Sequence, residues 1–139
     1  MRQEVNQDKQ QARTNTATKA RLLIKEAGTT DEAPLRESLR LRRFETANGQ
    51  SLPATVVRLL LRPLVDCEGD FDLVIGLETI VAEILECTHG RARLVKRKHD
   101  WAVYAVVAGS GAFHQSMLIW LAHKAVKNKW SLIEDHERP

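Results

Sequence analysis

Basic side chains gather in three parts of the sequence, and two of these groups are rich in arginine. The guanidinium group is planar and donates paired hydrogen bonds, which suits phosphate oxygens and the edge of guanine. A surface that only kept the protein dissolved would do as well with lysine. We therefore predict that the two arginine-rich groups contact nucleic acid. The three groups are Arg36, Arg40, Arg42 and Arg43; Arg91, Arg93, Lys96, Arg97 and Lys98; and Lys124, Lys127 and Lys129.

Acidic side chains form a second pattern, immediately before the second basic group. Residues 66–87 contain seven acids and no base, whereas residues 91–98 contain five bases and no acid. Surfaces of opposite sign favour docking of a charged protein partner, or of a second copy related by a two-fold axis. The alternative prediction is therefore a protein interaction module, such as an adaptor, an inhibitor or a dimerising subunit, which acts through Asp72, Glu83 and Glu86.

The position of the acids restricts how nucleic acid can be bound. A helix followed by a basic hairpin suggests a winged-helix protein, in which the helix before the hairpin enters the major groove. Here the stretch from Glu68 to Gly90 has no lysine or arginine, so phosphates would repel it. We therefore expect contact through the arginine-rich helix, the hairpin, or an N-terminal arm that carries Lys9 and Arg13.

Two cysteines and two histidines supply ligand types for a metal ion. Their spacing, C-x19-C-x-H-x9-H from Cys67 to His99, contains no short knuckle that would fix two ligands on one turn. Cys87 ends the apolar face of a predicted helix, where a small core residue fits. His89 suits the negative end of that helix. We therefore predict no bound metal and no other cofactor.

No catalytic motif is present in the sequence. A phosphate loop, a dinucleotide-binding glycine pattern, a nucleophile elbow and a zinc-protease helix are all missing. The glycine-serine-glycine run at 109–111 precedes a predicted helix and could hold an anion, but a tight turn explains it as well. His114 and His123 lie on different turns of that helix. We therefore predict a small non-enzymatic regulatory protein.

Composition is that of one ordinary globular domain, with 139 residues, 43% of them apolar and 28% charged, and a formal net charge of +3. We place the domain at residues 16–133, between a mobile polar arm (1–15) and a polar tail (134–139). Residues 101–122 have no charged side chain, but the polar centre at His114 argues against a membrane span. Because no signal-peptide pattern begins the chain, we predict a cytoplasmic protein without membrane contact.

Apolar spacing and turn signals predict the elements of the first half of the chain. A short helix is expected over 16–27, ended by Gly28. A second helix, capped by Asp31, would carry the first arginine group. A third helix is expected from Ser51 to Pro63, after a turn at Asn48-Gly49.

In the second half, an amphipathic helix is predicted over 71–87 and a last helix over about 112–128. The first of these has the apolar face Val74, Leu77, Val81, Ile84 and Leu85. Strands over 91–97 and 101–107 would pair as a hairpin. Since the second strand is apolar on both faces, we expect one helix on each side of it. The predicted fold class is α+β, with four to five helices around a two-stranded antiparallel hairpin at about 91–107.

Overall fold

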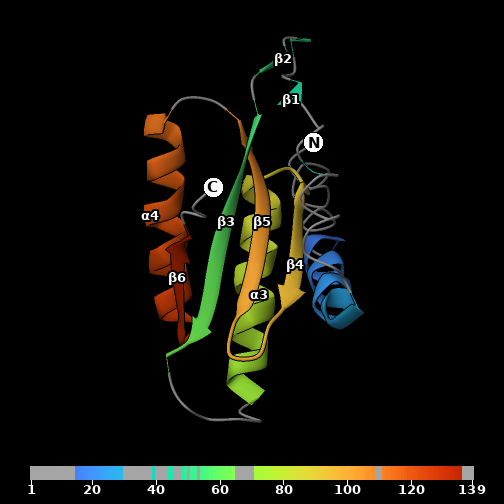
Figure 1. Ribbon diagram of the computed structural model, residues 1–139, viewed down its shortest axis with the longest axis vertical. Helices are drawn as coiled ribbons and strands as arrows, with labels where there is room; N and C mark the ends of the chain where they lie inside the picture. The colour runs from blue at the N-terminus through green and yellow to red at the C-terminus, as the bar shows by residue number, and fades with distance from the viewer. Residues whose placement is uncertain are drawn as a thin grey trace, which may run out of the picture.

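The computed structural model of the chain describes residues 15–29, 39, 44–45, 48–49, 51–52, 54–64, 71–108 and 111–135 (Figure 1). Residues 15–26 form an α-helix, which we call the N-terminal helix. It leads directly into a short 3-10 turn. The further elements are η1 (Ala27–Thr29), β1 (Phe44–Glu45), β2 (Ser51–Leu52), β3 (Ala54–Pro63), α3 (Phe71–Cys87), β4 (Ala92–Lys96), β5 (Trp101–Ala108), α4 (Gly111–Lys127) and β6 (Trp130–Glu134).

The main sheet is antiparallel and has the strand order β4-β5-β3-β6. Because α3 joins β3 to β4 and α4 joins β5 to β6, the connectivity is β-α-β-β-α-β, the ferredoxin-like or split β-α-β arrangement. The predicted mixture of helices and strands is present, but the predicted fold class is wrong. Among the described residues, three α-helices and a four-stranded sheet replace four to five helices and a two-stranded hairpin. The hairpin is present as β4 and β5 within that sheet.

The largest error concerns residues 51–63, which we predicted as a helix. They form β2 and the long central strand β3. In β3, Val57, Leu59 and Leu61 pack beneath the helices, as alternation along a strand requires. Leu60 lies between them and packs on the opposite face of the sheet. The strand is therefore apolar on both faces, and such a run cannot be told from a buried helix by its periodicity.

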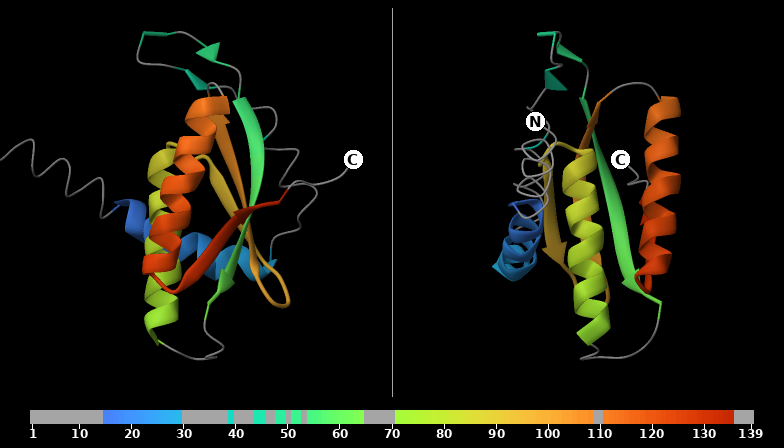
Figure 2. Two further views of the ribbon diagram at one scale, coloured as in Figure 1. Left: turned by 90° about the vertical axis from the view of Figure 1, so that its left-hand side faces the viewer. Right: turned by 180° about the vertical axis from the view of Figure 1, so that it is seen from behind.

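Three of the predicted helices, over 16–27, 71–87 and about 112–128, are confirmed, with each end within one residue of its predicted position. Their placement differs from the prediction, because α3 and α4 cover the same face of the sheet (Figure 2, right view). Leu77 and Ile84 of α3 meet Leu121 and Ala125 of α4 in one core with the strands. Val74, which we assigned to the apolar face of α3, is exposed.

The opposite face of the sheet, which we call the outer face, has an apolar row across its centre. Leu60, Ala102 and Val95 are neighbours in adjacent strands and are buried. Leu39 packs on this row and is itself buried. Leu39, and not α3 or α4, therefore covers β5 from this side. Leu39 belongs to the second predicted helix, most of which lies outside the described residues.

The two edges of the sheet have different surroundings. At the β4 edge, Ala20 of the N-terminal helix and Ala27 of η1 join the main core. The Nζ of Lys19 also donates to the carbonyl oxygen of Gly90, at 3.2 Å, just before β4 begins. The N-terminal helix therefore lies beside β4 (Figure 1). At the other edge, β6 pairs with β3 alone among the described strands.

A small separate sheet lies between Leu39 and β3 in the sequence. It pairs β1 with β2, and Phe44 lies opposite Leu52. The predicted turn at Asn48-Gly49 is confirmed, because Gly49 lies between these strands with φ of +78°. Glycine adopts this left-handed conformation without the strain that a side chain would cause.

Candidate nucleic-acid interface

Polar side chains on the outer face form a row at the end of the sheet where β4 turns into β5. Arg62 of β3 follows the pair Leu61 and Trp101, which places it beside Asp100 at the start of β5. The backbone N–H of Arg97 donates to the carbonyl oxygen of Asp100, at 2.9 Å, and closes the turn. Two arginines from distant parts of the sequence therefore lie on either side of one aspartate.

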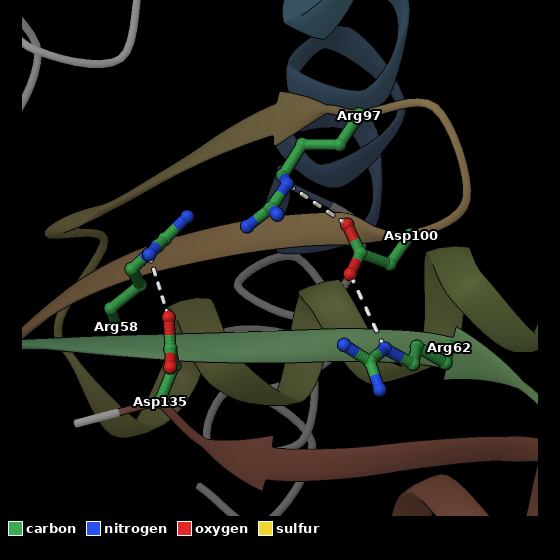
Figure 3. Close-up of polar contacts among 5 residues, drawn as sticks. All are labelled: Arg58, Arg62, Arg97, Asp100 and Asp135. Carbon is green, nitrogen blue, oxygen red and sulfur yellow. Dashed lines mark hydrogen bonds and ion pairs between the residues drawn. The ribbon is translucent and has the colours of Figure 1, made fainter. Parts of the chain in front are cut away.

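The carboxylate of Asp100 binds both arginines (Figure 3). Its Oδ2 accepts a hydrogen bond from Nε of Arg62 at 3.3 Å, and its Oδ1 forms an ion pair with Nε of Arg97, at 3.2 Å but without hydrogen-bond geometry. The side chain of Asp100 is 6% exposed, whereas those of Arg62 and Arg97 are 55% and 38% exposed. The buried acid therefore orients two guanidinium groups that reach solvent. We call Arg62, Arg97 and Asp100 the Asp100 cluster.

Both contacts of Asp100 use Nε, the inner nitrogen of each guanidinium group. Within the described part of the chain, no residue accepts a hydrogen bond from the terminal nitrogens of Arg62 or Arg97. These terminal nitrogens remain as donors for an outside acceptor. Lys98, exposed in the same turn, adds another positive charge. The chemistry suits an anion with several oxygen atoms, such as a phosphate group.

A second polar row crosses the outer face nearer the other end of the strands. Nη1 of Arg58 donates to Oδ2 of Asp135 at 2.6 Å, and its guanidinium carbon lies 5.8 Å from the ring centre of Tyr104. Tyr104 is buried, and the Arg58 side chain is only 15% exposed. Arg93, opposite Tyr104, donates to the carbonyl oxygen of Ala92. The contact between Arg58 and Asp135 ties the end of β6 to β3.

Only some of the predicted nucleic-acid-binding residues lie near the Asp100 cluster. Arg97 and Lys98 lie in the turn with the Asp100 cluster, but Arg91 precedes β4 and is about 20 Å from Arg97 at ~3.3 Å per residue. Lys96 lies 5.7 Å from the ring of Trp101. The first arginine group lies outside the described residues: Arg36, Arg40, Arg42 and Arg43.

Sequence reasoning missed Arg62 and Asp100. Arg62 lies within the predicted third helix, and Asp100 lies in the turn between the two predicted strands. One signal could have found the aspartate, because it is the only acid between residues 91 and 108. A lone acid beside a basic run is a candidate partner for arginines.

The predicted acidic residues lie on the helix-covered side and occupy two places. Asp72, at the start of α3, is 3.5 Å from Nζ of Lys129. Glu83 and Glu86 line an open groove of about 520 Å³, which the N-terminal helix, α3 and α4 enclose. Arg21 and Lys124 also line this groove, so its charge is mixed. The residues that line the groove are Ala17, Arg21, Ile75, Glu78, Thr79, Ala82, Glu83, Glu86 and Lys124.

Cys87 is half-buried against the core at the end of α3. Burial raises the pKa of its thiol, and the carboxylates of Glu83 and Glu86 raise that pKa further. The thiol therefore stays protonated at neutral pH, which makes it a poor nucleophile and a poor metal ligand. Among the described residues, which do not include Cys67, no group of three histidine, cysteine or acidic side chains could hold a metal ion.

None of the helices among the described residues is long and apolar enough to cross a membrane. Comparison of the chain with protein-family models, curated proteins and solved structures found no match. Function must therefore be argued from the geometry of the site.

Proposed function

We propose that the protein binds nucleic acid through phosphate contacts made by Arg62, Arg97 and Lys98. The observation that carries this proposal is the use of both Nε atoms by the buried carboxylate of Asp100. An arginine that is already oriented loses less side-chain freedom when it binds a phosphate. The same two side chains are exposed, so a phosphate backbone can reach them.

The outer face favours contact with the backbone rather than with bases. Proteins that bind RNA on a four-stranded sheet commonly stack bases on aromatic side chains of that sheet. Among the described residues, the aromatic side chain of the outer-face cluster is Tyr104, which is buried together with Leu39. Phosphate contacts position a protein on nucleic acid without reading its sequence. We therefore expect binding with little sequence preference and strong dependence on salt.

The alternative, a protein partner at the acidic residues, has weaker support. Asp72 and Glu78 already contact Lys129 and Arg21 within the chain. The groove that holds Glu83 and Glu86 also contains Lys124 and Arg21, so it does not select a partner of one charge.

The test measures binding of labelled single-stranded and duplex oligonucleotides by fluorescence anisotropy over a range of salt concentrations. The variant combines Arg62→Gln and Arg97→Gln with Asp100→Asn, so that no buried carboxylate is left without a cation. Arg21→Gln lowers the net charge by the same amount on the other side of the molecule and serves as the control. We expect the slope of log affinity against log salt to fall by about 2 in the cluster variant, roughly 1 per arginine, and to be unchanged in the control.

Two results would contradict the proposal. Wild-type protein that binds no oligonucleotide at low salt would exclude a phosphate interface. Equal loss of affinity in the cluster variant and in Arg21→Gln would show that net charge, and not the Asp100 cluster, determines binding. Thermal unfolding of each variant confirms that the comparison is between folded proteins.

A further inference from the structure

β6 is an edge strand whose free side is not covered by any other described strand. In the left view of Figure 2, β6 crosses in front of the sheet with α4 beside it, and this edge faces the viewer. The opposite edge lies against the N-terminal helix. An exposed edge offers a row of N–H and C=O groups that another strand can pair with.

The register with β3 shows which groups of β6 point away from the sheet. The N–H of Asp135 donates to the carbonyl of Arg58 at 2.8 Å, and the N–H of Leu64 donates to the carbonyl of Lys129 at 2.9 Å. In an antiparallel ladder these bonded positions alternate with positions that point to the other side. The N–H and C=O groups of Trp130, Leu132 and Glu134 therefore point outward.

These outward groups are self-complementary when a second β6 runs antiparallel to the first. A two-fold axis at Leu132 pairs Leu132 with its own copy and Trp130 with Glu134, so that every outward donor meets an outward acceptor. No two like charges lie directly opposite one another. A parallel arrangement in register would instead place Glu134 beside Glu134, which is unfavourable.

Exposed apolar side chains accompany this edge. Ile133 on the outer face of β6 is 47% exposed, and in the antiparallel pair it would face Ser131 of the other copy. Ile119 and Val126 of α4 are 61% and 58% exposed. The spacing of seven places both on one side of α4, away from Lys124, which lines the groove beside α3. They therefore lie on the exposed side of α4 that faces away from α3.

We propose that two copies of the chain associate through antiparallel pairing of β6 about a two-fold axis at Leu132, with α4 packed against α4. The two sheets become one continuous sheet of eight strands. This association does not depend on the proposed nucleic-acid binding. It does place both outer faces on the same side, with the Arg62 residues of the two copies about 15 Å apart at ~4.8 Å per strand.

The test is made without nucleic acid and has two readouts. Sedimentation equilibrium over a range of protein concentrations measures the mass, and amide hydrogen exchange measures protection residue by residue. We expect a dimer whose Leu132 and Glu134 amides are protected at high concentration and exchange rapidly on dilution. A monomer at the highest attainable concentration would overturn the proposal. A dimer whose outward amides exchange as fast as in the monomer would overturn it as well.

Two variants separate pairing of the edge from loss of folding. Glu134→Pro removes an N–H that points away from β3, so the monomer keeps its ladder but the dimer loses symmetric hydrogen bonds. Ile119→Lys with Val126→Lys places like charges across the α4 contact. We expect each to raise the dissociation constant of the dimer at least about tenfold. Leu22→Lys, an exposed leucine of the N-terminal helix, is the control. Pairing through β6 would be refuted if Glu134→Pro left the dissociation constant of the dimer unchanged. It would also be refuted if Leu22→Lys raised that constant equally.

Discussion

Asp100 contacts two arginines that lie far apart in the sequence, and it contacts each of them through Nε. Arg58 is held differently, because its terminal Nη1 donates to Asp135 and its side chain is mostly buried. Arg58 therefore stabilises the sheet, whereas Arg62 and Arg97 remain able to bind an outside anion. Residue type alone does not make this distinction.

Asp100→Asn distinguishes geometry from net charge. The substitution removes one negative charge and so raises the net charge by one unit, and simple attraction therefore predicts tighter binding to nucleic acid. We predict weaker binding, by about fivefold or more, because Arg62 and Arg97 would have to be ordered when the phosphate binds. Anisotropy at constant salt measures the effect. An increase in affinity would show that the carboxylate does not position the arginines for binding.

Some individual residues of the candidate interface could be predicted from the sequence. Arg97 and Lys98 could be identified because a basic run beside β-branched strands indicates an exposed hairpin. Arg62 could not, since its importance depends on the pairing of β3 with β5, which joins residues about forty positions apart. Such contacts depend on the register between strands. This register cannot be predicted when residues 51–63 are expected to form a helix.

The elements themselves were predictable where a single face is apolar. The helix at 71–87 alternates apolar and polar positions with the period of a helix, and α3 occupies those residues. β3 and β6 were not found, because each is short or apolar on both faces. The placement of α3 and α4 on one face also required knowledge of the sheet. When only a two-stranded hairpin is predicted, the simpler expectation is that one helix covers each of its faces.

Close packing between α3 and the turn after α4 depends on Gly76. A Cβ atom at this position would overlap the carbonyl oxygen of Asn128. We predict that Gly76→Ala lowers the free energy of unfolding by about 1–2 kcal/mol, because the overlap outweighs the better helix propensity of alanine. Urea denaturation measures this change. Gly28→Ala is the control, since nothing lies near its Cβ. A Gly76→Ala protein as stable as wild type would show that the turn after α4 can move away from α3 without cost.

At the scale of the whole molecule, the two sides of the sheet differ in charge. The acidic residues of α3 lie on the helix-covered side, where two of them, Glu78 and Asp72, contact Arg21 and Lys129 within the chain. The outer face carries the Asp100 cluster at one end, next to Lys98. The acidic-then-basic pattern of the sequence therefore becomes a separation in space. Nucleic acid bound at the cluster would lie away from the acids of α3.

The central claim is that the terminal nitrogens of Arg62 and Arg97 bind phosphate. The most direct measurement follows the guanidinium nitrogen resonances of isotope-labelled protein by NMR while a short oligonucleotide is added. We predict shifts in the Nη resonances of Arg62 and Arg97, and none for Arg58, which Asp135 holds. The absence of any shift at low salt, or shifts confined to other arginines, would contradict it.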